Sequence, residues 1–132
     1  MLIFYEYPKC STCKRAKAEL HRLGLTFESI DLTKTPPSKA TIKQWLKAGD
    51  KGKQNEKELA PRFQASSLKI FFNTSGQRYR ELGLKDRLAE LNLDEASSLL
   101  ASDGMLIKRP VLVKDDEVLQ IGYRTPYREL GL

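Results

Sequence analysis

Two cysteines three residues apart, Cys10 and Cys13, lie where a predicted strand meets a predicted helix. The residues before them, 2–5, form a short apolar run of strand-forming side chains. The residues after them, 14–23, have apolar side chains at helical spacing. A β-α-β unit with a C-x-x-C pair at the start of its helix is typical of a redox-active dithiol.

The predicted position of the cysteines favours their reactive form. The first turn of a helix has unpaired backbone N–H groups and a partial positive charge. Both stabilise a thiolate, which is the nucleophilic form of cysteine. Lys9, Lys14 and Arg15 add positive charge nearby.

The length and composition of the chain indicate one soluble domain. The chain has 132 residues, of which 40% are hydrophobic and 30% charged, as in ordinary globular domains. No apolar run approaches the ~20 residues that span a bilayer, and a strand-like segment begins at once, so we expect a cytoplasmic protein without a signal peptide. In a reducing cytosol a dithiol is more often catalytic or sensing than structural. A Cys10–Cys13 disulfide would also close too small a loop to stabilise the fold much.

The net charge and the sequence motifs limit which ligands we expect this protein to bind. A net charge of +6 permits an acidic partner or nucleic acid, but the cations are spread along the chain, so we expect no direct nucleic-acid binding. A G-x-G-x-x-G motif and a phosphate-binding loop are both missing, which implies no bound organic cofactor. Zinc needs about four ligands, and His21 is the single histidine, so we expect no metal.

Two strands flank the first helix. Residues 2–6 and 26–31 are predicted strands, and residues 11–23 are the predicted helix between them, with Gly24 as its stop. A helical connection makes the two strands a parallel pair.

The middle of the chain is predicted to be mainly helical. Ser38 is a candidate cap for a helix over residues 39–47, whose inward side chains are Ile42, Trp45 and Leu46. Residues 49–61 are predicted to be a loop with a short helical piece, and residues 73–76 a turn.

Two more helices and a hairpin are predicted in the rest of the chain. Residues 85–91 and 93–102 have leucine faces, and Asn92 with Glu95 resembles a capping box. Residues 111–113 and 118–121 form a hairpin pattern. The hexapeptide Tyr-Arg-Glu-Leu-Gly-Leu occurs at 79–84 and again at 127–132; we interpret it as two amphipathic helix ends.

Several segments resemble the ArsC/Spx family, which includes arsenate reductases and Spx-type transcriptional regulators. They are residues 7–13, 72–76, 79–82, 100–110 and 121–123. The resemblance covers nearly the whole chain and fits least well at about 49–66. It implies an α/β, thioredoxin-like fold in a single domain. The core would be residues 1–34 and 106–132, and a helical insertion at about 35–105 would separate the β-α-β unit from the C-terminal hairpin.

The resemblance also implies a set of site residues. Cys10 matches the family's nucleophile, and Arg109 matches an arginine beside the active site. Pro110 matches a proline that is cis and faces the cysteine loop. Cys13 would then resolve a mixed disulfide. Ser11 and Thr12 could donate hydrogen bonds to a thiolate, although both are also ordinary helix-start residues.

Three functions follow from the resemblance. The first is a thiol-disulfide oxidoreductase, with glutathione, glutaredoxin or thioredoxin as candidate electron donors. The second is a redox-sensing Spx-type regulator that binds the C-terminal domain of the RNA polymerase α subunit. The third is an arsenate reductase coupled to glutathione and glutaredoxin. Those reductases use two further arginines, whose positions fall near Asn73 and at Gly122, and an arsenate oxyanion needs several cationic or N–H donors.

Overall fold

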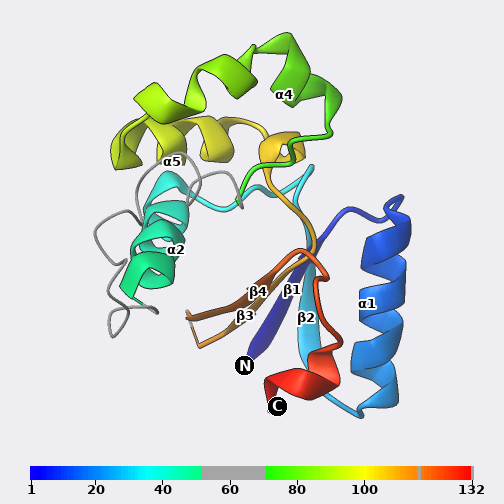
Figure 1. Cartoon of the computed structure of the whole chain (residues 1–132). Coiled ribbons are helices and arrows are strands. Elements are labelled where there is room, and N and C mark those ends of the chain that lie inside the picture. The colour runs from blue at the N-terminus through cyan, green and yellow to red at the C-terminus, as the bar shows by residue number, and fades with distance from the viewer. Residues whose placement is uncertain (52–70, 116, 132) are drawn as a thin grey trace. The chain divides into compact units, whose positions relative to one another are not determined.

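The computed structural model describes residues 1–51, 71–115 and 117–131. It divides into two compact units, one of Met1–Thr35 with Arg109–Leu132 and one of Pro36–Lys108, and Figure 1 shows the elements of both. The first unit contains β1 (Leu2–Glu6), α1 (Ser11–Arg22), β2 (Phe27–Asp31), β3 (Val111–Lys114), β4 (Glu117–Ile121) and the 3₁₀-helix η5 (Tyr127–Leu130). The second contains α2 (Lys39–Lys51), α4 (Gln77–Glu81), α5 (Leu93–Ser102) and the 3₁₀-helices η2 (Leu84–Asp86), η3 (Leu88–Glu90) and η4 (Gly104–Leu106).

A four-stranded sheet forms the centre of the first unit. Its strand order is β2-β1-β3-β4. β1 and β2 are parallel, whereas β3 is antiparallel to both β1 and β4. The predicted α/β fold class, the parallel strand pair around α1 and the C-terminal hairpin are confirmed. The hairpin loop is shorter than predicted because β3 extends through Lys114 and β4 begins at Glu117.

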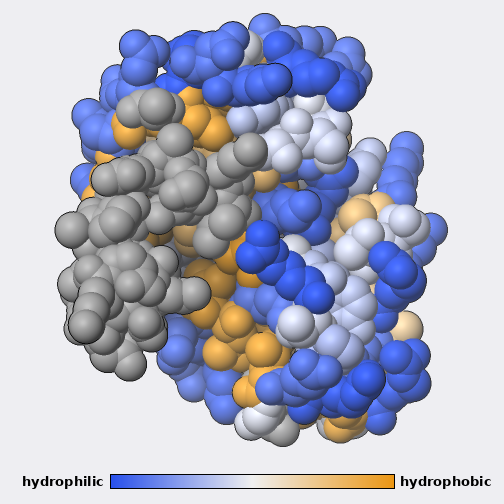
Figure 2. Space-filling model, viewed as in Figure 1, coloured by the Kyte–Doolittle hydropathy of each residue, from blue (hydrophilic) through white to orange (hydrophobic). Residues whose placement is uncertain are grey.

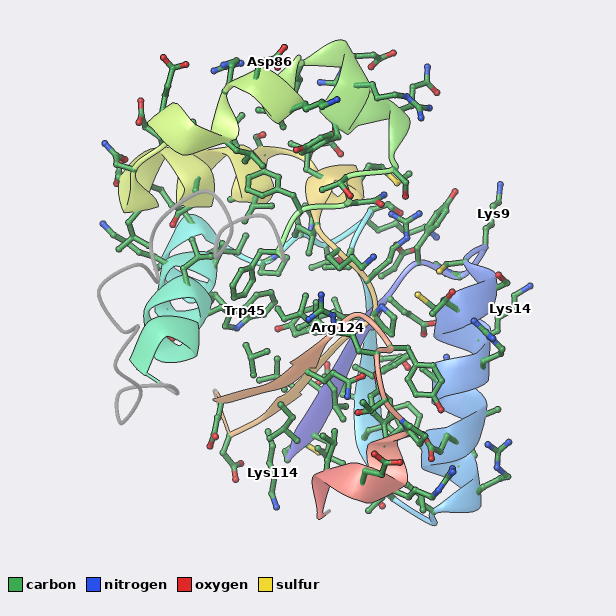
Figure 3. The ribbon with its side chains drawn as sticks, viewed as in Figure 1. Lys9, Lys14, Trp45, Asp86, Lys114 and Arg124 are labelled. Atoms are coloured by element: carbon green, nitrogen blue, oxygen red, sulfur yellow. The ribbon has the colours of Figure 1, made fainter. Side chains whose placement is uncertain are left out.

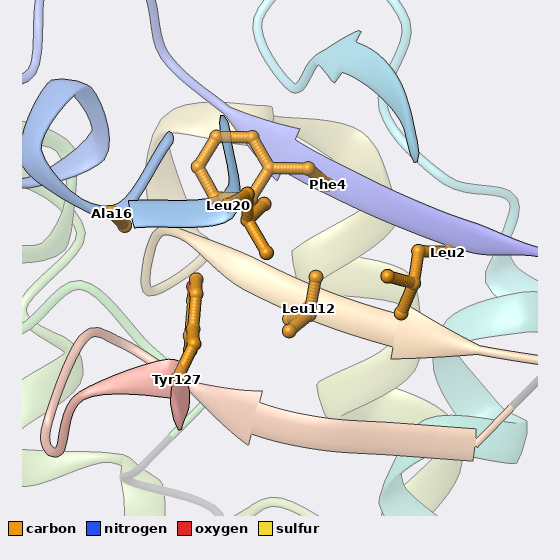
Figure 4. Packing of buried hydrophobic residues seen from close by; sticks show 6 residues of the cluster. All are labelled: Leu2, Phe4, Ala16, Leu20, Leu112 and Tyr127. Carbon is orange, nitrogen blue, oxygen red and sulfur yellow. The ribbon is translucent and has the colours of Figure 1, made fainter. Parts of the chain in front are cut away.

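Helix α1 packs on this sheet through one apolar face. Ala16 and Leu20 are fully buried in a cluster that also contains Leu2, Phe4, Leu112 and Tyr127 (Figure 4). The helix ends as predicted, with Gly24 at a φ of +71°, a conformation that glycine adopts at little cost. Hydrophilic residues dominate the outer surface over α1 in Figure 2. This is the amphipathic pattern that the sequence predicts for a helix with one buried side.

A buried carboxylate joins α1 to the C-terminal segment. Glu19 is 2% exposed. Its Oε1 accepts hydrogen bonds from the Tyr123 hydroxyl at 2.6 Å and from the backbone N–H of Tyr127 at 2.5 Å. Its Oε2 accepts from the backbone and guanidinium N–H groups of Arg128 at 3.3 and 3.4 Å. Because a buried carboxylate needs such donors, Glu19 fixes where η5 lies along α1.

In the second unit, α2 begins as predicted and ends later. The Ser38 hydroxyl oxygen accepts the backbone N–H of Thr41 at 3.1 Å, which confirms the predicted cap. The predicted inward side chains are 1–2% exposed: Ile42, Trp45 and Leu46. The loop predicted from residue 49 is wrong for residues 49–51, which are helical, because one glycine inside a helix costs only about 1 kcal/mol. The rest of that predicted loop lies outside the described residues.

The helix predicted over residues 85–91 is wrong. This stretch forms the two 3₁₀ turns η2 and η3, and the short helix α4, which the pattern missed, precedes them. Within the described residues, neither turn has a side-chain cap, so nothing favours a longer helix there. The leucine spacing reflects burial instead, because Leu84 and Leu88 are 0% and 4% exposed.

Helix α5 and the repeated hexapeptide match their predictions. Asn92 and Glu95 form the predicted capping box at the start of α5. Both copies of the repeat end a helical turn, with buried tyrosines at Tyr79 and Tyr127 and a left-handed glycine four residues after each of them. In both places the repeat therefore ends a helical turn with a glycine, just after a buried tyrosine.

Candidate active site

Cys10 is the N-cap residue of α1. Its backbone is extended, with φ −83° and ψ 121°, and its Sγ accepts the backbone N–H of Cys13 at 3.4 Å. Its carbonyl oxygen accepts the N–H of Lys14 at 3.1 Å, and its own N–H donates to the carbonyl of Tyr7 at 2.9 Å. The first turn of α1 contains no acidic residue. The sulfur therefore occupies the position where a helix best stabilises negative charge.

The two thiols differ in exposure. Cys10 is partly exposed, whereas Cys13 is 0% exposed. Both are free thiols. A reagent in solution therefore meets Cys10 first, and Cys13 can react only with a group that is already bound beside it.

The surroundings of Cys10 lower its pKa. Burial raises the pKa, but hydrogen bonds from the backbone and side chain of Cys13, together with the guanidinium of Arg109, outweigh that effect. The guanidinium acts both as a hydrogen-bond donor and as a nearby positive charge. Since a thiolate attacks and a thiol does not, Cys10 is the prepared nucleophile of the pair.

The surroundings of Cys13 have the opposite effect. Burial, together with the hydrogen bond to Cys10 and the charge of the Cys10 thiolate, raises the pKa of Cys13 to about 12, against the opposing effects of the Tyr7 backbone and Arg109. In the reduced protein, Cys13 is therefore a protonated hydrogen-bond donor to Cys10.

Arg109 and Pro110 lie in the same unit as the cysteines. Their peptide bond is cis, as the resemblance predicted. The Cζ atom of Arg109 lies 4.9 Å from the centroid of the Tyr7 ring, a cation–π distance. Its Nε and Nη1 are buried and have no hydrogen-bond partner among the described residues. A half-buried guanidinium with unused N–H groups is suited to an anionic group that arrives from outside.

The remaining predicted residues lie along the first turn of α1. Ser11 is exposed and Thr12 is half-buried. The Thr12 hydroxyl oxygen accepts a hydrogen bond from Nη2 of Arg15 at 3.4 Å. Lys9 and Lys14 extend away from the start of the helix in Figure 3. A donor role for the Ser11 and Thr12 hydroxyls toward a thiolate stays a prediction.

The sequence matches a known protein family. A family model described as the ArsC family matches residues 5–129. The chain belongs to the ArsC family.

Three relatives illustrate the range of this family. An uncharacterized protein, YusI of Bacillus subtilis, is 44% identical over 93% of this chain and 91% of its own length. The global transcriptional regulator Spx of Lactiplantibacillus plantarum is 27% identical over 93% of this chain and 80% of its own length. The crystal structure of "a possible arsenate reductase" from Streptococcus mutans is 55% identical, covers 100% of this chain and 98% of its own, and has a TM-score of 0.84. The ArsC-like fold is therefore shown.

The resemblance predicts arsenate-reductase arginines at two positions where this chain has the uncharged residues Asn73 and Gly122. At the first, the Asn73 amide donates to the carbonyl oxygen of Met105 at 3.4 Å and so has a local structural contact. At the second, Gly122 has a φ of +74° and no side chain. Neither residue is charged, and that these positions bear on arsenate binding stays a prediction from the resemblance.

Three residues near the dithiol were missed from the sequence of this ArsC-family protein. Tyr7 stacks with Arg109, Glu19 anchors the C-terminal segment, and Tyr127 is buried against α1. Glu19 did leave a signal, because it is a carboxylate next to the apolar face of a predicted helix. Tyr127 left a weaker one, as the first residue of a repeated hexapeptide.

The residues that the structure describes contain no group of three or more His, Cys, Asp and Glu side chains that could hold a metal ion. None of the described helices is both long and apolar enough to cross a membrane.

Proposed function

We propose that this ArsC-family protein is a cytoplasmic thiol-disulfide oxidoreductase in which Cys10 is the nucleophile and Cys13 the resolving thiol. The observation that carries this proposal is the contrast between two adjacent sulfurs. Cys10 is accessible and has a lowered pKa, whereas Cys13 is buried and has a raised one. Such asymmetry assigns the two steps of disulfide exchange to different residues.

The proposed reaction has two exchange steps. The Cys10 thiolate attacks one sulfur of a substrate disulfide, so that a Cys10–substrate bond forms, the substrate S–S bond breaks and one thiolate leaves. The Cys13 thiolate then attacks the Cys10 sulfur, which forms the Cys10–Cys13 disulfide and releases the second substrate thiolate. The substrate gains two electrons and the dithiol loses two. Glutathione, glutaredoxin or thioredoxin would return the protein to its dithiol form.

Arg109 and its neighbours have supporting roles in this proposal. Arg109 holds the Cys10 thiolate and orients an incoming anion or thiol with its unused N–H groups. Pro110 shapes the loop beside the cysteines, and the Ser11 and Thr12 hydroxyls donate hydrogen bonds to the bound sulfur.

Trapping tests the assignment of the two steps. In Cys13→Ser, Cys10 can still form a mixed disulfide with glutathione but cannot release it, so mass spectrometry should find about one glutathione per chain at Cys10. Cys10→Ser is the matched control and should carry almost none, because Cys13 is buried. Equal labelling of both variants would contradict the proposal.

A regulatory function is the second candidate. It is favoured by the 27% identity to an Spx regulator over 93% of this chain and by the C-x-x-C pair, which can serve as a redox switch without catalysing turnover. The expected partner is the C-terminal domain of the RNA polymerase α subunit. A pull-down with reduced and with oxidised protein tests this function, and absence of binding in both states would exclude it.

Arsenate reduction is the third candidate. The likeness to a structure described as a possible arsenate reductase favours it, and the uncharged residues Asn73 and Gly122 oppose it. With glutathione and glutaredoxin present, we expect no arsenate-dependent oxidation above the rate of Cys10→Ser. Turnover that Cys10→Ser abolishes would place the protein among the reductases.

A further inference from the structure

Tyr127 lies on the same side of α1 as Cys13. Its ring belongs to the buried cluster that contains Ala16 and Leu20, and Figure 4 shows it rising from η5 toward α1. Cys13 precedes Ala16 by three residues and is 0% exposed. Residues at this spacing share one face of a helix. The Tyr127 ring therefore follows the helix face that carries the buried thiol.

The hydroxyl of Tyr127 is buried and makes no hydrogen bond to the described residues of the reduced protein. The residue is 0% exposed, and its Oη has no hydrogen-bond partner among the described residues. Buried hydroxyls are nearly always paired, because an unpaired one loses its bonds to water without replacement. An unpaired buried hydroxyl calls for a partner in another state of the protein.

Cys13 changes its charge during the proposed exchange, and it lies on the face of α1 against which the Tyr127 ring packs. Burial raises the pKa of Tyr127, and the nearby charges of Cys13, Tyr123 and Glu19 raise it as well. The hydroxyl therefore stays protonated while Cys13 ionises, and it can only be a donor to the thiolate. The Glu19 carboxylate accepts a hydrogen bond from the backbone N–H of Tyr127. This bond keeps Tyr127 close to α1.

We propose that Tyr127 is a positioning residue for the resolving step, in which its hydroxyl donates a hydrogen bond to the Cys13 thiolate as that thiolate attacks the Cys10 sulfur. This inference rests on the proposed function. In the mixed disulfide, the Cys10 sulfur carries no charge and no longer opposes ionisation of Cys13. Burial still does, and a donor inside the core offsets it.

A two-step colour assay separates the two cysteines. Dithiobis(nitrobenzoate) releases one coloured thiolate when Cys10 attacks it and a second when Cys13 closes the disulfide. Stopped-flow absorbance against pH thus gives a rate for each step. The variant is Tyr127→Phe. The matched control is Tyr123→Phe, which loses a hydroxyl that binds Glu19 at 2.6 Å in the same segment.

The expected result is specific to the second step. Loss of a donor that cuts the thiolate fraction about tenfold also makes the remaining thiolate about threefold more nucleophilic, so closure should slow about threefold. Its pH profile should move to higher pH, and the first step should not change. An unchanged second step, or equal slowing of both steps in both variants, would overturn the proposal.

Failure of the proposed function gives a different result. If the unmodified protein releases a single equivalent of coloured thiolate, the dithiol does not close and the oxidoreductase proposal fails. Tyr127 is then tested by the Raman S–H band of Cys13 in a Cys10→Ser background. A higher titration midpoint of this band in Tyr127→Phe than in Tyr123→Phe supports the interaction, and equal midpoints exclude it.

Discussion

At the scale of single residues, Cys10 has two independent sources of stabilisation for its thiolate. One is the backbone of α1, through the N–H of Cys13, and the other is the guanidinium of Arg109. The first cannot be removed without changing how the helix begins, but the second can be removed by one substitution. Arg109 therefore offers the clearest test of how the nucleophile is prepared.

Arg109→Leu should raise the pKa of Cys10, because a nearby positive charge and hydrogen-bond donor are lost. Alkylation of Cys10 by iodoacetamide at neutral pH should slow by roughly threefold or more, and its pH profile should move to higher pH. Arg15→Leu is the control, since Arg15 donates to the Thr12 hydroxyl instead. An equal effect of both substitutions would show that only total charge matters.

The site residues that were predictable from the sequence differ from those that were not. Cys10 and Cys13 could be proposed because their spacing and their place between a strand and a helix are local features. Arg109 and Pro110 were proposed through the family resemblance. Tyr7 and Tyr127 were missed, because a stacking ring or a buried hydroxyl becomes meaningful only after distant segments meet.

At the scale of elements, one buried carboxylate of α1 accepts all the hydrogen bonds described between this helix and the C-terminal segment. Glu19 is buried and accepts hydrogen bonds from Tyr123, Tyr127 and Arg128. Burial raises the pKa of Glu19, but these donors together hold it below its ordinary value of 4.5. The charged form is therefore the one that stabilises the fold.

Glu19→Ala should destabilise the protein by about 2 kcal/mol, because it leaves buried donors unpaired. The sign of the pH dependence follows from the lowered pKa: the Glu19 contribution is complete above about pH 4.5 and is lost as the pH falls through the folded-state value. Urea unfolding of both proteins from neutral to acidic pH measures this difference. If the difference in unfolding free energy between the unmodified protein and Glu19→Ala does not change with pH, the charge of Glu19 does not have the expected role.

The capping box of α5 gives a second test at this scale. Asn92 accepts the N–H of Glu95 at 2.8 Å, and the Glu95 carboxylate accepts the N–H of Asn92 at 3.0 Å. Asn92→Ala should cost about 1 kcal/mol of unfolding free energy, measured by urea titration. Ser98→Ala, at an exposed position of the same helix, should cost nothing or add slight stability. Equal effects would mean that the cap contributes little.

The elements that were predicted correctly share a local signal. α2 has its serine cap and α5 its capping box, and each strand of the hairpin has an apolar run. The 3₁₀ turns η2 and η3 have apolar spacing without a cap, and there the predicted helix was wrong. Periodicity reports which side chains become buried, whereas caps report where a helix begins, and a helix prediction needs both.

At the scale of the whole molecule, the cations behind the net charge of +6 are spread along the sequence. Some of them nevertheless lie close to Cys10. Lys9 and Lys14 extend from the start of α1, and no acidic residue lies in the first turn. Lys114 pairs with Leu2 at the beginning of β1, whereas Cys10 follows the end of that strand. The two lysines Lys9 and Lys114 therefore allow an equal change of net charge at opposite ends of one strand.

We expect Lys9→Glu to slow the attack of Cys10 on the dianionic dithiobis(nitrobenzoate) by about fivefold at low salt, since like charges then face each other at short range. Lys114→Glu should have little effect, although it changes the net charge by the same amount. The effect should shrink as added salt shortens the Debye length to about 10 Å at 0.1 M. A neutral disulfide, dithiodipyridine, should react at nearly the same rate with all three proteins.

The reaction rates of the two lysine variants distinguish the effect of charges near Cys10 from the effect of the net charge of the whole protein. Equal slowing by both substitutions would mean that the charge of the whole molecule steers the reagent, and the cations around α1 would then have no special part. Slowing of the neutral disulfide by Lys9→Glu would instead indicate a change in the Cys10 thiolate itself. If the anionic reagent alone responds, and only to Lys9→Glu, then the start of α1 selects acidic partners by electrostatic attraction before any sulfur reacts.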